Sequence, residues 1–171
     1  VYNISHAHLM DLDMLKRLAS IKNIKGVKYT ASTHFNFNKI KKEIGESFKI
    51  YSGMDEMALS GLISGADGII GSFYNLMPEM FVGIYKNIND GNINEAKKLQ
   101  EKVNIIILYA LKKSGYPFIK MGLNWLGIDS GYVRRPFASL VDSEIKNKIK
   151  NDLKKLSEEH DLSGIKFLNA L

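Results

Sequence analysis

The sequence of 171 residues contains no cysteine. Disulfides and thiolate metal sites are therefore excluded, and the absence fits a reducing compartment. We find neither a secretory signal nor an apolar run long enough to cross a bilayer, so we expect no membrane partner. The most glycine-rich stretch, 65–71, lacks the GxGxxG spacing of a phosphate-binding loop.

Basic residues outnumber acidic ones and give a formal net charge of +6. Much of the excess lies at 145–156, where apolar residues recur every three or four positions and lysines fill the positions between. This pattern predicts an amphipathic helix with a solvated basic face. Nucleic-acid binding is the alternative. No aromatic platform or recognised motif accompanies the lysines, so we expect no nucleic-acid partner.

Strand-like and helix-like segments alternate along the first half of the chain. Short apolar segments predict strands at 1–4, 24–30, 48–52 and 68–72. Apolar residues at helical spacing predict helices at 11–20, 35–44, 55–64, 78–89 and 94–114. Asn94 is the predicted N-cap of the last of these. Strands that alternate with helices imply parallel pairing through right-handed crossovers.

The spacing of these strands indicates the fold class. They recur about every 20 residues, a tight βα repeat compatible with a (β/α)8 TIM barrel. Because four strands cannot close a barrel, we predict an α/β fold: the second half of a TIM barrel at 1–93 and a helical extension packed on it at 94–171. A small open α/β sheet is the alternative. The chain opens with Val1 in strand-like sequence, so we expect a further segment upstream.

One lysine lies inside an apolar strand. Alternation along the strand places Gly26, Lys28 and Thr30 on one face, with Val27 and Tyr29 on the other. Burial favours the neutral amine of a lysine, which is a nucleophile that can form a Schiff base with a ketone. The alternative is a lysine near the strand end whose stem packs while its ammonium reaches solvent.

More polar side chains follow the carboxyl ends of the predicted strands, where parallel α/β folds gather reactive groups. They are a phenol, two hydroxyls and two carboxylates: Tyr2, Thr30, Ser72, Asp55 and Glu56. With Lys28 they suit a Schiff-base enzyme acting on a polyhydroxylated carbonyl compound. Each also has a structural alternative: ring packing for the phenol, a helical first turn for the carboxylates and turn capping for the hydroxyls.

The four histidines give a weaker signal. His6 and His8 share a loop, but no acidic or thiol partner is evident nearby, so we predict no metal site. His34, which precedes a predicted helix, and His160, near the tail, are predicted to be surface residues. The last segment, 161–171, is compatible with packing or with fraying.

Several motifs taken together match one family. They are Tyr2–Ile4, Gly26–Thr30, Tyr51–Glu56, Gly65–Gly68, Gly71–Asn75 and Arg135–Phe137. In order and spacing, residues 1 to about 140 resemble the C-terminal part of N-acetylneuraminate lyase, in the class I aldolase family that also holds dihydrodipicolinate synthase. The Gly-x-Asp-Glu segment at 53–56 favours the lyase branch, as does the absence of an arginine shortly after Tyr2-Asn3.

The resemblance implies a reaction and a role for each site residue. The lyase cleaves N-acetylneuraminate, a sialic acid, reversibly to pyruvate and N-acetylmannosamine, with no metal or organic cofactor. Lys28 matches the Schiff-base lysine, and Tyr2 matches the tyrosine that shuttles the proton of the C4 hydroxyl. The positions that hold the sugar part of the substrate match Thr30, Gly53, Asp55, Glu56 and Ser72.

The resemblance also implies a cytoplasmic enzyme of carbohydrate metabolism that binds small molecules and forms a homo-tetramer. The family holds the pyruvate carboxylate with a Gly-x-x-x-Ser/Thr loop on an early strand. These residues do not supply that loop, so we expect the chain to be inactive alone. Two alternatives stay open: an aldolase for another 2-keto-3-deoxy sugar acid, and a non-catalytic half-barrel homologue. The second is also suggested by Ser5, which stands where the family usually has proline.

Overall fold

The computed structural model describes residues 1–4, 9–113 and 115–171. Ser5, His6 and His8 lie outside the described residues, so the predictions made for them are untested. The chain forms two compact units. The first contains Val1–Gly71 and Tyr85–Ala96, and the second contains Ser72–Ile84 and Lys97–Leu171. The predicted boundary between residues 93 and 94 stays a prediction.

The first unit is built on a four-stranded parallel sheet in the order β1-β2-β3-β4. The strands are β1 (Tyr2–Ile4), β2 (Gly26–Thr30), β3 (Lys49–Ser52) and β4 (Gly68–Ile69). They confirm the four predicted strand positions, although β4 is shorter than expected. The pairing register aligns Tyr2 with Lys28, and Lys28 with Tyr51. Facing residues of a parallel pair share a sheet face, so these three side chains form one row.

Helices connect successive strands of this sheet. They are α1 (Leu12–Ala19), α2 (Asn36–Ile44), the short 3₁₀ helix η1 (Asp55–Met57) and α3 (Ala58–Ile63). The side chain of Asp11 caps α1 by accepting a hydrogen bond of 2.8 Å from the Met14 N–H. Gly45 follows α2 with a φ of 112°, a backbone conformation that suits glycine. The helices predicted at 11–20 and 35–44 are confirmed to within one residue at each end, whereas the one predicted at 55–64 is a 3₁₀ helix followed by a short α-helix.

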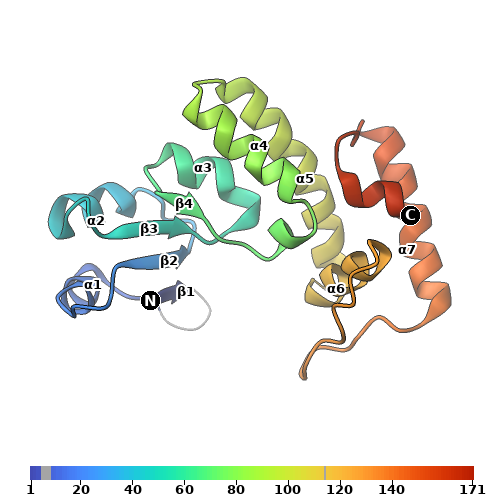
Figure 1. Cartoon of the computed structure of the whole chain (residues 1–171), viewed down its shortest axis with the longest axis horizontal. Coiled ribbons are helices and arrows are strands. Elements are labelled where there is room, and N and C mark those ends of the chain that lie inside the picture. The colour runs from blue at the N-terminus through green and yellow to red at the C-terminus, as the bar shows by residue number, and fades with distance from the viewer. Residues whose placement is uncertain (5–8, 114) are drawn as a thin grey trace. The chain divides into compact units, whose positions relative to one another are not determined.

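One face of the sheet carries the core of this unit. Val27, Tyr29 and Ile50 pack with Leu15 of α1 and Phe37 of α2 in one buried cluster, and Figure 1 shows these helices beside the sheet. The other face carries Tyr2, Lys28, Thr30 and Tyr51, which are half-buried or exposed; we call it the open face. The alternation predicted for β2 is therefore confirmed.

An ion cluster lies at the amino ends of β3 and β4. The Asp67 carboxylate accepts hydrogen bonds from the Ile50 N–H at 2.8 Å and from Lys49 Nζ at 2.9 Å, and it pairs with Lys41 Nζ at 2.7 Å. Burial alone would raise the pKa of Asp67. The hydrogen bonds from Lys41, the Ile50 N–H and Lys49 outweigh it and lower this pKa to about 2. The cluster ties α2 to the end of the sheet opposite the strand carboxyl ends.

Helices form the second unit. Two of them, α4 (Pro78–Asn89) and α5 (Ile93–Lys113), have residues in both units. The others are η2 (Phe73–Asn75), α6 (Tyr116–Trp125), α7 (Ser143–Glu159) and η3 (Lys166–Ala170). The tail packs, since Leu162, Ile165 and Phe167 are buried. No helix among the described residues combines the length and apolar content that a membrane span requires.

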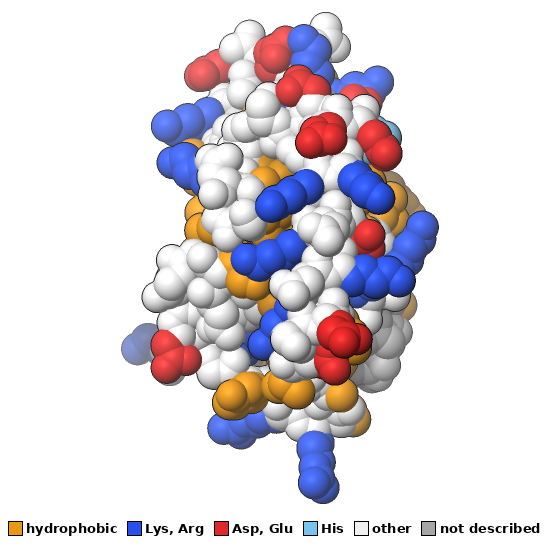
Figure 2. Space-filling model, turned by 90° about the vertical axis from the view of Figure 1, so that its right-hand side faces the viewer, with side chains coloured by type: hydrophobic (Ala, Val, Ile, Leu, Met, Phe, Trp, Pro, Cys, Tyr) orange, Lys and Arg blue, Asp and Glu red, His pale blue; other side chains and the backbone are white. Residues whose placement is uncertain are grey.

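One prediction for this part of the chain is wrong and another is confirmed. Asn94 is not the N-cap of α5, because the helix begins at Ile93 and the Asn92 carbonyl accepts the first hydrogen bonds from the Glu95 and Ala96 N–H groups. Because the turn that follows α4 is short, α5 begins one residue before Asn94, the predicted capping residue. α7 confirms the predicted amphipathic helix, with Ile149 and Leu153 buried. Figure 2 shows lysines and carboxylates interspersed on the side that carries it.

Candidate functional site

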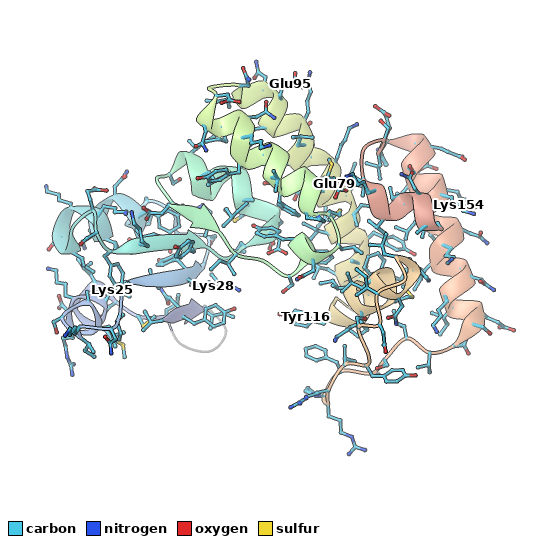
Figure 3. All side chains as sticks on the ribbon, in the orientation of Figure 1. Lys25, Lys28, Glu79, Glu95, Tyr116 and Lys154 are labelled. Atoms are coloured by element: carbon cyan, nitrogen blue, oxygen red, sulfur yellow. The ribbon has the colours of Figure 1, made fainter. Side chains whose placement is uncertain are left out.

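Lys28 projects from the open face of β2. Its neighbours along the strand, Val27 and Tyr29, are 1% and 3% exposed on the covered face, whereas Lys28 is half-buried. Its backbone N–H donates to the Val1 carbonyl at 2.8 Å, which holds β2 against β1. Figure 3 shows Lys25 and Lys28 toward opposite ends of β2, with Lys28 at the carboxyl end. The amine is therefore placed where parallel folds bind their substrates.

Tyr2 is the neighbour of Lys28 across the β1–β2 pair. The Lys28 Nζ atom lies 4.8 Å from the centroid of the Tyr2 ring. This separation is within the range of cation–π contacts. Tyr2 is 50% exposed, so its ring covers the amine without enclosing it. The structure thus brings the predicted amine and phenol together, each within reach of one small molecule.

Thr30 and Gly53 lie beside the lysine on β2 and after β3. A Cβ atom on Gly53 would come within 2.1 Å of Thr30 Oγ1, which is closer than Cβ atoms approach other atoms, and 3.0 Å of Lys28 Cε. Glycine is therefore required for the close approach of the two strand ends. Thr30 Oγ1 is buried and makes no hydrogen bond within the described part of the chain. A buried hydroxyl without a partner is costly and is a candidate to bind a ligand.

The two predicted carboxylates open η1, directly after β3. Asp55 is 7% exposed and Glu56 is half-buried. A Cβ atom on Gly71 would lie only 1.8 Å from Asp55 Oδ1, so the end of the β4 segment has room for this carboxylate because residue 71 is glycine. The structural alternative, acidic residues in a helical first turn, also describes their position.

Ser72 lies in the second unit, immediately before η2. Its proximity to Lys28 stays a prediction. Phe137 of the Arg135–Phe137 motif belongs to the same unit and packs edge-on against the Tyr116 ring, with the two centroids 5.2 Å apart. The structure therefore brings Tyr2, Lys28, Thr30 and Gly53 together around one amine, while the place of Ser72 beside them is inferred from the chain order alone.

The prediction that His34 is a surface residue is wrong. This residue is 4% exposed, whereas His160 is exposed as predicted. His34 Nδ1 lies 2.9 Å from Ser60 Oγ, and its ring stacks on Phe37 with centroids 4.9 Å apart. Burial lowers the pKa of His34 below its usual value. His34 precedes α2 but is buried together with Phe37 and Ile40 of that helix, and the three residues are spaced three apart in the sequence.

Comparison with known proteins decides the family. The model of the dihydrodipicolinate synthetase family matches residues 1–156. The chain belongs to this family. The match covers the whole sheet, the open face with Lys28 and most of α7. The fold is accordingly that of four βα units of a (β/α)8 barrel followed by helices.

Relatives within the dihydrodipicolinate synthetase family give closer comparisons. The chain is 35% identical, over 134 residues, to an N-acetylneuraminate lyase of Rhizobium meliloti (strain 1021), covering 78% of this chain and 44% of that protein. It is similar to CdNal of Clostridium difficile, solved in complex with mannosamine, at 30% identity and a TM-score of 0.81, covering 90% of this chain and 53% of the other.

A third comparison concerns a structure with a bound ligand. The N-acetylneuraminate lyase of Fusobacterium nucleatum, solved with pyruvate, is 31% identical with a TM-score of 0.79, covering 90% of this chain and 52% of the other. The chain thus spans about half the length of the relatives it matches.

Proposed function

We propose that the protein carrying this chain is a Schiff-base aldolase, a carbon–carbon lyase that cleaves N-acetylneuraminate reversibly to pyruvate and N-acetylmannosamine. One observation carries the proposal: an amine and a phenol lie side by side on the open face, with Lys28 Nζ 4.8 Å from the Tyr2 ring centroid. It is supported by a relative named N-acetylneuraminate lyase at 35% identity and by relatives solved with pyruvate and with mannosamine.

The first half of the proposed reaction forms the iminium. The neutral Lys28 amine attacks the C2 ketone of the open-chain keto acid and gives a carbinolamine. The Tyr2 phenol donates its proton to the departing hydroxyl, which leaves as water. The products of this step are a positively charged iminium on Lys28 and a phenolate at Tyr2. The cation beside the ring stabilises that phenolate, because opposite charges attract.

The second half breaks the C3–C4 bond. The Tyr2 phenolate takes the proton of the C4 hydroxyl, C4 becomes an aldehyde, and the bonding electrons pass through C3–C2 to the iminium nitrogen. N-acetylmannosamine leaves, and a neutral enamine of pyruvate remains on Lys28. Protonation at C3 and hydrolysis by water then release pyruvate and regenerate the amine. Every proton in this scheme is exchanged with Tyr2 or with solvent, so no cofactor is needed.

The sugar part of the substrate meets the groups at the ends of β2 and β3. We propose that Thr30 Oγ1, which is buried without a hydrogen bond to any described residue, binds a substrate hydroxyl. Carboxylates are strong acceptors for sugar hydroxyls, the role proposed for Asp55 and Glu56. Gly53 belongs to the same proposed set, and its lack of a side chain lets Thr30 Oγ1 and Lys28 Cε lie close together. Ser72 is proposed to complete this set, and no group of this chain is assigned to the pyruvate carboxylate.

Borohydride trapping with pyruvate tests the proposal. The native protein, expressed from its full reading frame, is incubated with pyruvate, reduced and digested, and the modified peptide is identified by mass spectrometry. We expect a reduced pyruvyl adduct on Lys28. K28R should abolish it, because the guanidinium keeps its charge and is not a nucleophile. K25R is the matched control, since Lys25 lies just before β2 and is exposed, and it should trap like the wild type.

The outcomes separate the alternatives. An adduct together with cleavage of N-acetylneuraminate supports the lyase. An adduct with cleavage only of a 2-keto-3-deoxy sugar acid replaces the substrate and keeps the mechanism. A folded native protein with no adduct at any pH would falsify the aldolase proposal and leave a non-catalytic homologue. We further propose a cytoplasmic homo-tetramer, and light scattering of the native protein, which should give four times the mass of one chain, measures that assembly.

A further inference from the structure

His34 ties together two successive βα units. It lies in the connection from β2 to α2, six residues after Lys28. Its Nδ1 atom is 2.9 Å from Ser60 Oγ on α3, and its ring stacks on Phe37 of α2. The backbone also holds the ring in place, because the His34 N–H donates to the Ser32 carbonyl at 2.9 Å. The His34 side chain thus joins the β2–α2 connection to α3.

The two units joined in this way carry different parts of the site. The βα unit of β2 and α2 supplies Lys28 and Thr30 at the end of β2. The βα unit of β3 and α3 supplies Gly53 and the carboxylates of η1, which leads directly into α3. The contact between α3 and β3 is close, since a Cβ atom on Gly61 would lie 2.2 Å from Ser52 Oγ. A shift of the β2–α2 connection relative to α3 would therefore change how the amine faces the carboxylates.

Burial favours the neutral form of the His34 ring, which lies against Ser60. His34 is 4% exposed, and its Nε2 atom is buried with no hydrogen-bond partner among residues 1–4, 9–113 and 115–171. An imidazolium carries a proton on both nitrogens, so protonation would place a second, unpaired N–H in the core. Water would solvate that proton only if the connection moved away from α3.

Charges around the ring do not offset this cost. Phe37, which stacks on the ring, and Ser60, which bonds to it, are uncharged, and α3 contains no ionisable residue. The neighbouring elements η1 and α2 carry the following ionisable side chains: Asp55, Glu56, Lys39, Lys41, Lys42 and Glu43. None of them contributes to the lowered pKa of His34, which has burial as its cause. Within the described part of the chain, no carboxylate therefore stabilises the charged form of the ring.

We propose that His34 is a positioning residue that holds the β2–α2 connection against α3 only while it is neutral, so that mild acid misaligns Lys28 and Thr30 with the carboxylates of η1. The misalignment of the catalytic groups rests on the proposed function. The pH-dependent contact between His34 and Ser60, called the tie below, does not. Residues with no contact to substrate thereby give the site an acid limit of its own, separate from the titration of Lys28 and Tyr2.

The test compares two variants across pH in the native protein. H34N keeps an amide at the position of Nδ1, so it can bond Ser60 but does not titrate. S60A removes the partner from the surface of α3 and leaves the ring. The measured quantity is the rate of borohydride trapping with pyruvate, divided by the wild-type rate at the same pH. Lys28 and Tyr2 are the same in all three proteins, so their own titration cancels in this ratio.

The proposal predicts opposite trends. As the pH falls from about 7 to about 5, the H34N ratio should rise about fivefold, because only the wild type loses its tie. The S60A ratio should start well below one and approach one in acid, where the wild type has lost the same bond. H160N, at an exposed histidine, is the matched control and should give a constant ratio. A constant ratio for H34N would overturn the proposal.

A second measurement keeps the tie testable without catalysis. The stability of wild type and H34N is measured by urea unfolding across the same pH range. Because burial holds the native pKa below that of the unfolded chain, the wild type should lose stability as pH falls from about 6.5, and H34N should not. If the unfolding free energies of wild type and H34N change in parallel with pH, the tie is refuted, whether or not an adduct forms. If these free energies diverge but no adduct is trapped, only the aldolase proposal is refuted. If H34N does not fold, S60A and the NMR titration of His34 decide.

Discussion

Replacing Gly53 with alanine tests the packing around the candidate amine. The added Cβ atom would lie 2.1 Å from Thr30 Oγ1 and 3.0 Å from Lys28 Cε. Gly53 does not have a left-handed φ, so alanine is compatible with the backbone and the effect is steric. Lys28 can move its flexible end. Thr30 is β-branched and part of β2, so its hydroxyl can leave only by rotating to a disfavoured side-chain conformer or by moving the strand.

The expected cost of Gly53→Ala follows from overpacking. Inserting a methyl group into a well-packed site typically destabilises a protein by about 1–3 kcal/mol, and we expect the middle of this range. Urea unfolding measures the change. The rate of borohydride trapping should fall as well, because the displaced threonine and lysine share the site. Removing the obstructing hydroxyl with Thr30→Ala in the same protein should restore about 1 kcal/mol, the scale expected for coupled neighbours.

Two results would refute this reasoning. If Gly53→Ala changes the unfolding free energy by less than about 0.5 kcal/mol, the level typical of uninvolved surface sites, the two strand ends are not closely packed. If the double variant is no more stable than Gly53→Ala alone, the clash is not with Thr30. Gly68→Ala is the matched control in β4. Its Cβ atom would meet the edge of the Tyr51 ring at 3.2 Å, and this ring can yield, so a smaller cost is expected.

Three further predictions concern other contacts. Gly71→Ala would place a Cβ atom 1.8 Å from Asp55 Oδ1, so we expect a loss of about 1–3 kcal/mol on urea unfolding and a raised KM for the sugar substrate. Asp67→Asn should cost about 1–2 kcal/mol at neutral pH after allowance for solvent screening. Because the pKa of Asp67 is lowered to about 2, this difference should disappear as the pH falls from about 4 to 2 in acid unfolding. Tyr109→Phe removes the 2.8 Å hydrogen bond from its hydroxyl to Asp152, and thermal or urea unfolding should show a loss of about 1 kcal/mol.

Most of the first unit could be predicted from local pattern. Apolar alternation located β2 and the face that carries Lys28, and helical spacing located α1, α2 and α4. These elements follow from periodicity because one side of each is buried against a neighbour. β4 was overestimated, since only Gly68–Ile69 pair with β3. Residues 70–72 are similar in composition to Gly68–Ile69, so the sequence does not show where β4 ends. The end depends on how far β3 extends beside it.

The candidate site could be predicted only in part. Tyr2 and Lys28 were placed together from the rule that parallel strands end at the same edge, which needs no knowledge of distances. The steric role of Gly53 could not be predicted, because it arises from the register of β2 against β3. His34 was misplaced because a histidine before a helix is usually at the surface, whereas its bond to Ser60 joins elements far apart in the sequence.

The two ends of the sheet carry different tasks, and this separation makes the predictions independent. Asp67 binds the backbone of Ile50 and two lysines at the amino ends of the strands, where no proposed catalytic group lies. Lys28, Thr30 and Gly53 meet at the carboxyl ends. A substitution of Asp67 should therefore lower stability and leave the trapping rate per folded molecule unchanged, whereas Gly53→Ala should lower both. If Asp67→Asn slowed trapping in the folded protein, the two ends would be coupled through β3, and the position of Gly53 would be the first place to look for the shift.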